Sequence, residues 1–390
     1  MAVTSSMNHF NFPFAPSTEA ENSLRAEVRE FLQDEIKTGG FTPGADCWMS
    51  ESCPEFSAKL GARGWLGMVW PKKYGGHERS PLERLVVTEE LLAAGAPVAA
   101  HWIADRQTGT QILRFGSEQQ RQSILPRMAA GTCFAAIGMS EPQAGSDLAA
   151  VQTKADKIPT GWRLSGRKIW STGAHRSDYM IVLARTSPAD GRNRQVGLSQ
   201  FLVPLQAQGV EISGIKDIAG NVHFNETLFD GVELEADALL GIEGNGWAQC
   251  MGELVLERSG PERFLSNFVL LDRALISLRG QLDKHGAAIL GELITTLNAL
   301  RLMSRSIARQ LENGLSPDTE AALVKLIGNS FEQDVVTRVR QLLSTIPRDQ
   351  WPDELAPMLD QSIFRLPPGT LRGGTSEILR GMIARQLGMR

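Results

Sequence analysis

The stretch WRLSGRKIW, residues 162–170, belongs to a region in which the sequence changes from a helical to an extended period. Between about 131 and 240, short runs of β-forming residues alternate with clusters of Gly, Pro, Asn and Asp. The other runs are CFAAIGM (133–139), DYMIVLART (178–186), LSQFLVPL (198–205) and TLFDGVEL (227–234). Such spacing is typical of a small antiparallel barrel or sandwich.

Helical periods precede this region. Leu24, Val28 and Phe31 recur at i, i+4 and i+7, which places them on one face of a helix. Ser117 and Gln120 have the spacing of a capping box, so a helix is expected to begin there. The first part of the chain is therefore predicted to be helical.

Long helical patterns return from about residue 245 onward. They are interrupted at NGLSPD (313–318) and across the proline-containing stretch 346–370. The order helical, extended, helical predicts an α+β chain of three domains. These are an N-terminal helical domain (1–130), a middle antiparallel β-barrel or sandwich domain (131–242) and a C-terminal helical bundle (243–390).

Composition narrows the class of protein. The 390 residues are 42% hydrophobic and carry a net charge of -4, which gives no electrostatic basis for binding nucleic acid or an acidic membrane. No leader peptide is expected, and no apolar run approaches the roughly 20 residues of a bilayer span. Four cysteines without CxxC spacing fit reduced thiols. We expect a cytoplasmic globular protein.

Several common site motifs are missing. The middle region lacks alternating βαβ units and GxGxxG, which argues against a Rossmann site. The chain also lacks GxxxxGK[ST] and HExxH, and its six histidines never cluster with ligand spacing. No metal site is expected.

Two stretches of the middle region could carry chemistry. In MSEPQAGSDLAAVQTKA (139–155), a strand ends at Ser140 and runs into a glycine turn that contains Ser146. Small hydroxyl residues and exposed backbone amides suit a planar, hydrogen-bonding ligand, although an ordinary polar turn has the same composition. In GRKIWSTGA (166–174), Trp170 offers a stacking face and Thr172 lies two residues on, on the same side of a strand. A core tryptophan in a hairpin is the alternative.

The chain resembles the acyl-CoA dehydrogenase family along most of its length. The matching motifs are GWLGMVWPKKYGG (64–76), MSEPQAGSDLAAVQTKA (139–155), GRKIWSTGA (166–174), LVLERSG (254–260) and GGTSEILRGMIARQLG (373–388). The resemblance implies the helical, β, helical fold, FAD as cofactor and an acyl-CoA thioester as substrate. It also implies an electron-transferring flavoprotein as acceptor and assembly into an oligomer.

The resemblance assigns roles to individual positions. Met139 and Ser140 are implied to lie against the flavin, and Trp170 and Thr172 to pack on its ring and hydrogen-bond near N5. Contact with flavin or pantetheine is implied for Ser146. Three further positions are implied: Thr375 at the cofactor, and Arg258 and Gly374 at the substrate.

Dehydrogenation of a thioester needs a carboxylate that takes the α-proton and donors that hold the thioester oxygen. Many family members carry this Glu immediately before the Gly-Thr of the C-terminal motif, but here that position is Gly373. The resemblance implies that the backbone N–H there still points at the thioester oxygen. The base must then lie elsewhere, or the chain is inactive.

Glu257 is the candidate base. On a helix that begins near Gly246, Trp247, Cys250 and Leu254 form one stripe, and Glu257 extends it. An unpaired carboxylate on an apolar stripe is costly, so it needs a partner or a function. The alternative is a structural ion pair. Isovaleryl-CoA and long-chain acyl-CoA dehydrogenases, which this arrangement resembles, place their base in this Leu-x-x-Glu-Arg context.

Two family features are missing. The usual Arg-x-x-Phe-Gly segment, whose Arg reaches the FAD pyrophosphate of a neighbouring subunit, and the later Gly-Gly segment have no counterpart. Pro261 is expected to lie inside the helix of Glu257 and to kink it. Either a hetero-oligomeric partner supplies the missing contacts, or a homo-oligomer uses Arg263 or Arg273.

Two alternative functions remain open. One is a related flavin oxidase or monooxygenase that acts on a substrate other than a thioester. The other is a flavin-binding or scaffold subunit of a hetero-oligomeric acyl-CoA dehydrogenase. The residues do not indicate the length, branching or steroid nature of the acyl group.

Overall fold

The computed structural model describes residues 10–191, 193–258 and 260–389, without the side chains of 253–257. The chain packs into two compact units, which are described separately. Unit 1 comprises Met1–Asp46, Pro81–Ala96 and Val255–Arg390, and unit 2 comprises Cys47–Ser80 and Pro97–Leu254. The three-domain division at 130 and 242 follows the sequence period, not this packing, and stays a prediction.

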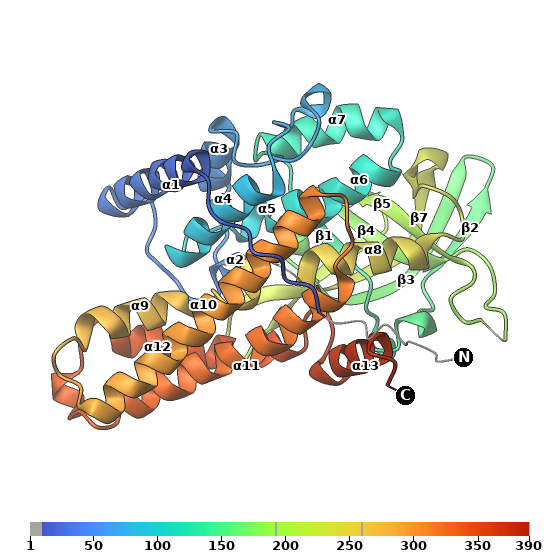
Figure 1. Ribbon diagram of the computed structural model, residues 1–390. Coiled ribbons are helices and arrows are strands. Elements are labelled where there is room, and N and C mark those ends of the chain that lie inside the picture. Colours follow the sequence, from blue (N-terminus) through green and yellow to red (C-terminus); the bar gives the residue numbers. More distant parts are fainter. Residues whose placement is uncertain (1–9, 192, 259, 390) are drawn as a thin grey trace, which may run out of the picture. The chain divides into compact units, whose positions relative to one another are not determined.

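Unit 1 is helical. Its helices are α1 (Glu19–Lys37), α4 (Pro81–Ala93), the end of α8 (Gly246–Arg258), α9 (Phe268–Ser277), α10 (Lys284–Glu312), α11 (Asp318–Leu343), α12 (Leu355–Arg365) and α13 (Ser376–Gln386). Figure 1 shows α10 and α11 side by side, and α11 also packs against α9, α12 and α13. The predicted apolar face of α1 is confirmed, because Leu24, Val28 and Phe31 are buried.

Two expectations about this unit are wrong in detail. The stretch 346–370 is not a plain interruption, since it contains α12. Pro261 does not lie inside the helix of Glu257: α8 ends at Arg258, and Pro261 begins the 3-10 turn η6 (Pro261–Arg263). Gly260 is extended, with φ -77° and ψ 160°. A residue before proline avoids the helical region, so the helix ends before the proline and is not kinked by it.

No membrane-spanning segment was expected from the sequence. Helix α10 is nevertheless long and apolar enough to cross a membrane by length and composition alone. A core helix of a helical bundle has the same properties. In unit 1 it packs against α11 and α4, and its Arg301 and Arg305 pair with Glu89 and Glu21. These contacts place α10 within the bundle of unit 1.

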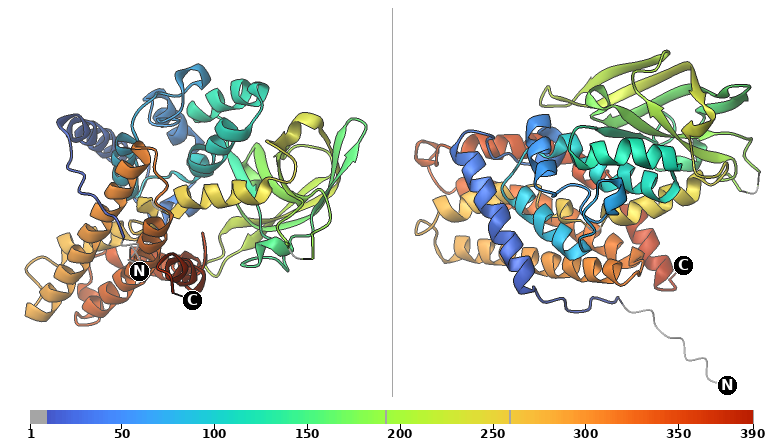
Figure 2. Two further views of the ribbon diagram at one scale, coloured as in Figure 1. Left: turned by 45° about the vertical axis from the view of Figure 1, so that its right-hand side comes forward. Right: turned by 90° about the horizontal axis from the view of Figure 1, so that it is seen from above.

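Unit 2 contains an eight-stranded sheet. Its strands are β1 (Ala135–Gly138), β2 (Lys154–Ile158), β3 (Gly161–Thr172), β4 (Tyr179–Arg185), β5 (Leu198–Pro204), β6 (Val210–Lys216), β7 (Val222–Glu235) and β8 (Leu239–Leu240). The order is β6-β7-β3-β2-β4-β5-β8, with β1 beside β4. Most pairs are antiparallel, but β1 and β2 each run parallel to β4. Figure 2 shows the sheet from two further sides.

The five predicted runs contain β1, β4 and β5 and much of β3 and β7, whereas β2, β6 and β8 were not predicted. Strand side chains form a buried cluster that includes Trp162, Leu164, Val182, Phe201, Val203, Phe229, Val232 and Leu234. Together with the helices of unit 1, the sheet confirms the predicted α+β fold class.

Short helices complete unit 2. They are α2 (Cys47–Ser50), α3 (Pro54–Ala62), α5 (Ala99–Ile103), α6 (Gly109–Phe115) and α7 (Glu118–Ala129). The capping box of Ser117 and Gln120 is confirmed at the start of α7. Between α5 and α6 the chain forms a π-helical turn, η2 (Ala104–Thr108). Such turns are rare and often lie at functional sites.

Candidate active site

Strand β3 carries the predicted stacking residue Trp170 at a β-bulge. Its register with β7 shifts between Lys168 and Ser171, and Trp170 has φ of 62°, a region that a bulky residue rarely adopts. Before the bulge, Trp162, Leu164 and Lys168 are buried; in the bulge, Trp170 is 55% exposed, and Ser171 after it is buried. The bulge therefore turns the indole outward.

The surroundings of Trp170 leave its ring accessible. It meets Phe224 edge to face, with ring centroids 5.8 Å apart at 89°. Thr172 is half-buried, and the buried Ser171 separates it from Trp170. Because the bulge interrupts the alternation of the strand, the expectation that Trp170 and Thr172 share one side stays a prediction. Their roles at a cofactor stay predictions.

Lys168 forms a buried ion pair with Glu141. Their Nζ and Oε1 atoms are 2.8 Å apart, and the side chains are 0% and 2% exposed. The same Nζ donates to the carbonyl of Met139 at 3.0 Å, and the N–H of Ile169 donates to the carbonyl of Ser140 at 2.9 Å. The segment after β1, which holds two predicted flavin contacts, is thus fastened to β3 beside the bulge.

Glu141 is the centre of a larger network. Oε1 also accepts from Thr153 N–H at 2.9 Å, and Oε2 accepts from Gln152 N–H at 2.7 Å and Gln143 Nε2 at 2.8 Å. Burial alone would raise the pKa of Glu141, but the charge and hydrogen bond of Lys168, with the other donors, lower it below its usual value. Burial lowers the pKa of Lys168 to about 8. Both groups are therefore charged at neutral pH.

The sequence analysis missed this pair, although a signal was present. Lys168 occupies an inward position of an alternating strand, where a charge requires a partner. Ser146, by contrast, lies on an exposed turn next to Asp147, which pairs with Arg194 at 2.7 Å. Its hydroxyl is open to a ligand, and its role stays a prediction.

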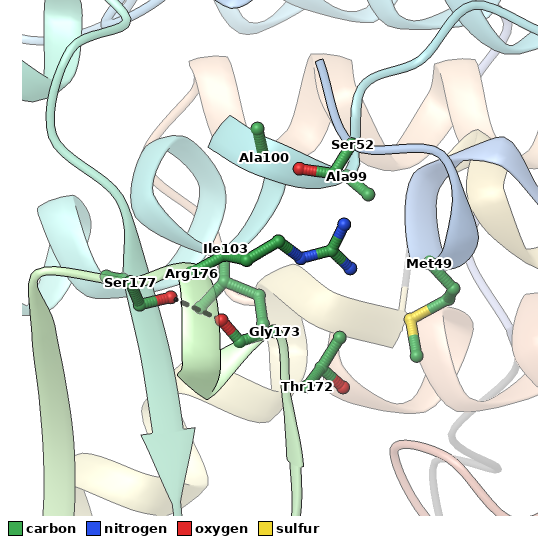
Figure 3. Close-up of a pocket in the computed structure, with 10 residues that line it drawn as sticks. Met49, Ser52, Ala99, Ala100, Ile103, Thr172, Gly173, Arg176 and Ser177 are labelled. Atoms are coloured by element: carbon green, nitrogen blue, oxygen red, sulfur yellow. Dashed lines mark hydrogen bonds between the residues drawn. The ribbon is translucent and has the colours of Figure 1, made fainter. Parts of the chain in front are cut away.

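A pocket in unit 2 brings Thr172 together with residues that the sequence analysis did not consider. Its lining consists of Met49, Ser52, Ala99, Ala100, Ile103, Ala135, Thr172, Gly173, Arg176 and Ser177. Figure 3 shows the guanidinium of Arg176 pointing into this pocket. Trp170 does not line the pocket. The pocket therefore lies beside the end of β3 that follows the bulge, where Thr172 is.

In unit 1, the two glycines before α13 adopt conformations that side chains rarely allow. Gly373 has φ of 65° and Gly374 has φ of 108°. A Cβ at Gly374 would lie 3.4 Å from Arg258 Nη2. The backbone conformation alone therefore favours glycine at both positions.

Arg258 holds this glycine segment. Its Nε donates to the carbonyl of Gly373 at 3.0 Å, and its Nη1 lies 3.4 Å from Met382 Sδ. The side chain is only 6% exposed. A substrate contact, as predicted for Arg258, remains a prediction; the observed contacts show a residue that positions the backbone of Gly373.

The residues around the glycines are fixed by further bonds. Thr375 caps α13, its Oγ1 accepting from Ile378 N–H at 3.4 Å, which leaves its own proton for a ligand. On the other side, Arg372 pairs with Asp46 at 3.3 Å, and Asp46 N–H donates to Ser266 O at 2.7 Å. The predicted cofactor role of Thr375 stays a prediction.

Of the two arginines predicted to replace the missing pyrophosphate contact, Arg263 is 4% exposed. Arg273 is half-buried, with Nε 3.9 Å from Glu354 Oε2. Arg273 is therefore the one of the two whose side chain reaches the surface of unit 1, and either role stays a prediction.

The predicted base, Glu257, falls in α8, but its side chain lies outside the described residues, as does that of Leu254. Of the proposed stripe, Cys250 is buried, and Trp247 packs in the same cluster. Among the groups that the structure describes, no cluster of three His, Cys, Asp or Glu could hold a metal ion.

The donor set in unit 2 fits a flavin. A flavin needs a flat apolar surface for its ring system and donors for its ring nitrogen and carbonyl atoms. The outward indole of Trp170 supplies the first, and the hydroxyls of Ser140 and Thr172 supply the second. The ion pair of Lys168 and Glu141 holds the segment of Ser140 beside β3, because Lys168 Nζ also donates to the carbonyl of Met139.

Known proteins match most of the chain. Family models for the N-terminal, middle and C-terminal domains of acyl-CoA dehydrogenases match residues 18–132, 136–232 and 283–388. Acyl-CoA dehydrogenase IpdE1 of Mycobacterium tuberculosis is 32% identical over 379 residues, which cover 93% of this chain and 96% of that protein.

The mitochondrial long-chain specific acyl-CoA dehydrogenase of Rattus norvegicus is 29% identical, over 93% of this chain and 85% of its own. The solved structure of the "Tcur3481-Tcur3483 steroid ACAD" has a TM-score of 0.84 and 27% identity, over 96% of this chain and 99% of its own. The chain belongs to the acyl-CoA dehydrogenase family, whose members are oxidoreductases with FAD as cofactor.

Proposed function

We propose that the chain oxidises the Cα–Cβ bond of an acyl-CoA to the trans-2-enoyl-CoA, with Glu257 as the base. The carboxylate of Glu257 takes the α-proton, and the electrons of that C–H bond become the new double bond as the β-hydride leaves. FAD, when bound, supplies the acceptor for the β-hydride at its N5. Family membership supports the reaction class, and the residues below support the assignment of the base.

One contact carries the assignment. Arg258 follows Glu257 directly, and its Nε donates to the carbonyl of Gly373 at 3.0 Å. The end of α8 and the Gly373 segment therefore meet within unit 1. Many relatives carry their base at the position of Gly373, so a carboxylate one residue from Arg258 can serve the same place from the other element.

Gly373 supports the same reaction without a side chain. We infer that its backbone N–H donates to the thioester oxygen, where negative charge develops as the α-proton leaves. Its carbonyl is held by Arg258, so this backbone is ordered before the substrate binds. A glycine tolerates the left-handed φ that the segment requires.

The relatives suggest a bulky substrate and a second subunit. A solved structure of similar fold is that of a steroid-acting enzyme named for two proteins. We infer a branched or steroid-like acyl group and a hetero-oligomer in which a partner supplies the contacts of the missing Arg-x-x-Phe-Gly segment. We further infer that an electron-transferring flavoprotein takes the electrons away.

An anaerobic titration tests the proposed function. Purified chain loaded with FAD is mixed with short, long, branched and steroid-like acyl-CoAs, and the flavin absorbance is followed. We expect at least one acyl-CoA to bleach the flavin, and the rate to fall by about 10² to 10⁴ in Glu257→Gln.

Glu253→Gln, one turn earlier on α8, is the matched control and is expected to bleach at the normal rate. Full activity of Glu257→Gln with bound FAD would refute the assignment of the base. Peroxide or a hydroxylated product, without any response to acyl-CoA, would favour an oxidase or monooxygenase.

The second candidate is a flavin-binding or scaffold subunit. The absence of the Arg-x-x-Phe-Gly and Gly-Gly segments favours it. Such a subunit is colourless when purified alone and gains flavin only with its partner. Expression with and without a related acyl-CoA dehydrogenase subunit, followed by the absorbance of each purified product, separates it from an independently active enzyme.

A further inference from the structure

The pocket of unit 2 contains one charge. Of its ten lining residues, Arg176 alone is ionised at neutral pH; the others are apolar or carry hydroxyl groups. Met49, Ala99, Ala100 and Ile103 form an apolar wall, and Ile103 directly precedes the π-helical turn η2. A single guanidinium in an otherwise uncharged pocket can define which polar group a ligand may carry.

The backbone beside Arg176 is firmly placed. Gly173 has φ of 64° and begins the 3-10 turn η4 (Ala174–Arg176). Its N–H donates to His223 O at 2.8 Å, and its carbonyl accepts from Ser177 Oγ at 3.0 Å. The adjacent His175 ring meets Asn225 Oδ1 at 2.9 Å. The turn therefore directs Arg176 into the pocket, as Figure 3 shows.

Within the described part of the chain, the guanidinium of Arg176 has no hydrogen bond or ion pair, and the side chain is exposed. Partial burial lowers the pKa of Arg176, and the negative charge of Glu51 counteracts this. An arginine nevertheless stays protonated and presents five N–H donors in a planar fork. Donors without a partner among the described residues are available to a ligand that brings an oxygen acceptor.

The pocket also holds Thr172, the residue proposed to act near flavin N5. A substrate whose β-carbon reacts there must place the atoms beyond that carbon near the same residues. Carboxylate and carbonyl oxygens are the acceptors that a guanidinium fork binds best.

We propose that Arg176 selects acyl-CoA substrates whose acyl group carries a carboxylate or ketone oxygen beyond the reacting carbons. This inference rests on the proposed function, and it adds the polar group of the substrate to it. The apolar wall of Met49, Ala99 and Ile103 accepts the hydrocarbon, and Arg176 binds the oxygen.

The test uses the full chain with FAD, purified with its partner subunit if flavin binding requires one. Three acyl-CoA series of equal chain length differ only in a terminal methyl, ketone or carboxylate. kcat and KM are measured for each, and the binding of 3-thia analogues, which cannot lose a β-hydride, is measured by calorimetry. Comparison of the ketone and carboxylate arms identifies which oxygen is preferred.

We expect the oxygen-bearing substrates to lose about tenfold to a hundredfold in kcat/KM and in analogue affinity in Arg176→Gln, with alkyl substrates unchanged. Arg176→Lys should keep part of the preference, because a lysine binds as a point charge without the fork. Arg167→Gln, which removes an exposed arginine of β3 paired with Glu226, is the control and should change neither.

Equal losses for alkyl and oxygen-bearing substrates in Arg176→Gln, or no loss for either, would overturn the inference while acyl-CoA bleaching upheld the proposed function. A shift in flavin affinity without any change in substrate preference would also overturn it and assign Arg176 to the cofactor. If no acyl-CoA bleaches the flavin, the proposed function fails and this inference fails with it.

Discussion

Each unit contains a buried glutamate that accepts hydrogen bonds from two successive backbone N–H groups. In unit 2, Glu141 binds the N–H groups of Gln152 and Thr153. In unit 1, Glu332 binds those of Ser266 and Asn267, at 2.7 and 2.9 Å. The geometry of the two carboxylates is thus similar, and both order loops near the proposed site residues of their own unit.

The two glutamates differ in their charged neighbours. Glu141 has the ammonium of Lys168 at 2.8 Å, and its pKa is lowered. For Glu332 the described residues provide no cation; burial, with the negative charge of Asp46, raises its pKa to about 7 despite the donors around it. A neighbouring cation, more than the number of hydrogen-bond donors, decides whether a buried carboxylate stays ionised at neutral pH.

The largest effect is expected from breaking the ion pair in unit 2. Glu141→Gln or Lys168→Met leaves a buried charge or polar group without its partner, and should lower the free energy of unfolding by about 3–5 kcal/mol. The double variant should cost less than the sum of the two. Chemical denaturation and FAD affinity measure the result.

Asp147→Asn is the control, because it removes a comparable but exposed pair with Arg194 and should cost less than about 1 kcal/mol. If Lys168→Met is as stable as the control and keeps its flavin, the ion pair does not organise this part of the site.

A pH profile distinguishes the two glutamates. The pKa of Glu332 is raised above the usual 4.5, so its contribution to stability is full below about pH 4.5 and is lost as the pH rises through 7. The lost contribution is roughly 3 kcal/mol at a shift of this size. Glu141 has the opposite sign: its contribution is present above pH 4.5 and is lost as the pH falls.

The measurement is the free energy of unfolding of wild type minus that of Glu332→Gln, and of wild type minus Glu141→Gln, between pH 4.5 and 8. The first difference should fall with rising pH. If both differences change with pH at the same slope, the neighbouring charges do not give the two carboxylates different pKa values.

A smaller effect is expected from Arg258, which acts on the backbone of the glycine segment in unit 1. Arg258→Met should cost about 1.5–3 kcal/mol of stability and lower kcat for all acyl-CoAs alike, because the Gly373 carbonyl loses its charged donor. Steady-state kinetics with two unrelated acyl groups check this. Arg380→Met on the exposed face of α13 is the control. A rise in KM alone, with kcat unchanged, would instead assign Arg258 to substrate binding.

Much of the fold was predictable because it depends on local pattern. The apolar face of α1, the capping box of α7 and five strands follow from periodicity and caps, which act within a few residues. The parallel pairing of β1 with β4 was not predictable, because it joins segments that are distant in the sequence. The prediction that Pro261 lies inside α8 was wrong for a local reason. Gly260, the residue before the proline, is extended, so the helix ends at Arg258.

The site was predictable where a motif carries it and not where packing creates it. Trp170 and Thr172 were proposed from their motif, but the bulge that exposes the indole appears only in the register of β3 with β7. Arg176 gave no signal, since a single arginine in a loop has many uses. Gly373 and Gly374 have positive φ angles, which the sequence did not predict and which explain in part why no side chain stands at these positions.

The most direct test of the central claim is α-proton exchange. A 3-thia acyl-CoA keeps its α-protons but cannot lose a β-hydride, so in deuterated buffer only the proton step is observed. With FAD bound, wild-type chain should exchange the α-protons, and Glu257→Gln should exchange them about 10² to 10⁴ times more slowly, as followed by mass spectrometry. Exchange at the wild-type rate in flavin-loaded Glu257→Gln would contradict the account, because the base would then be another residue.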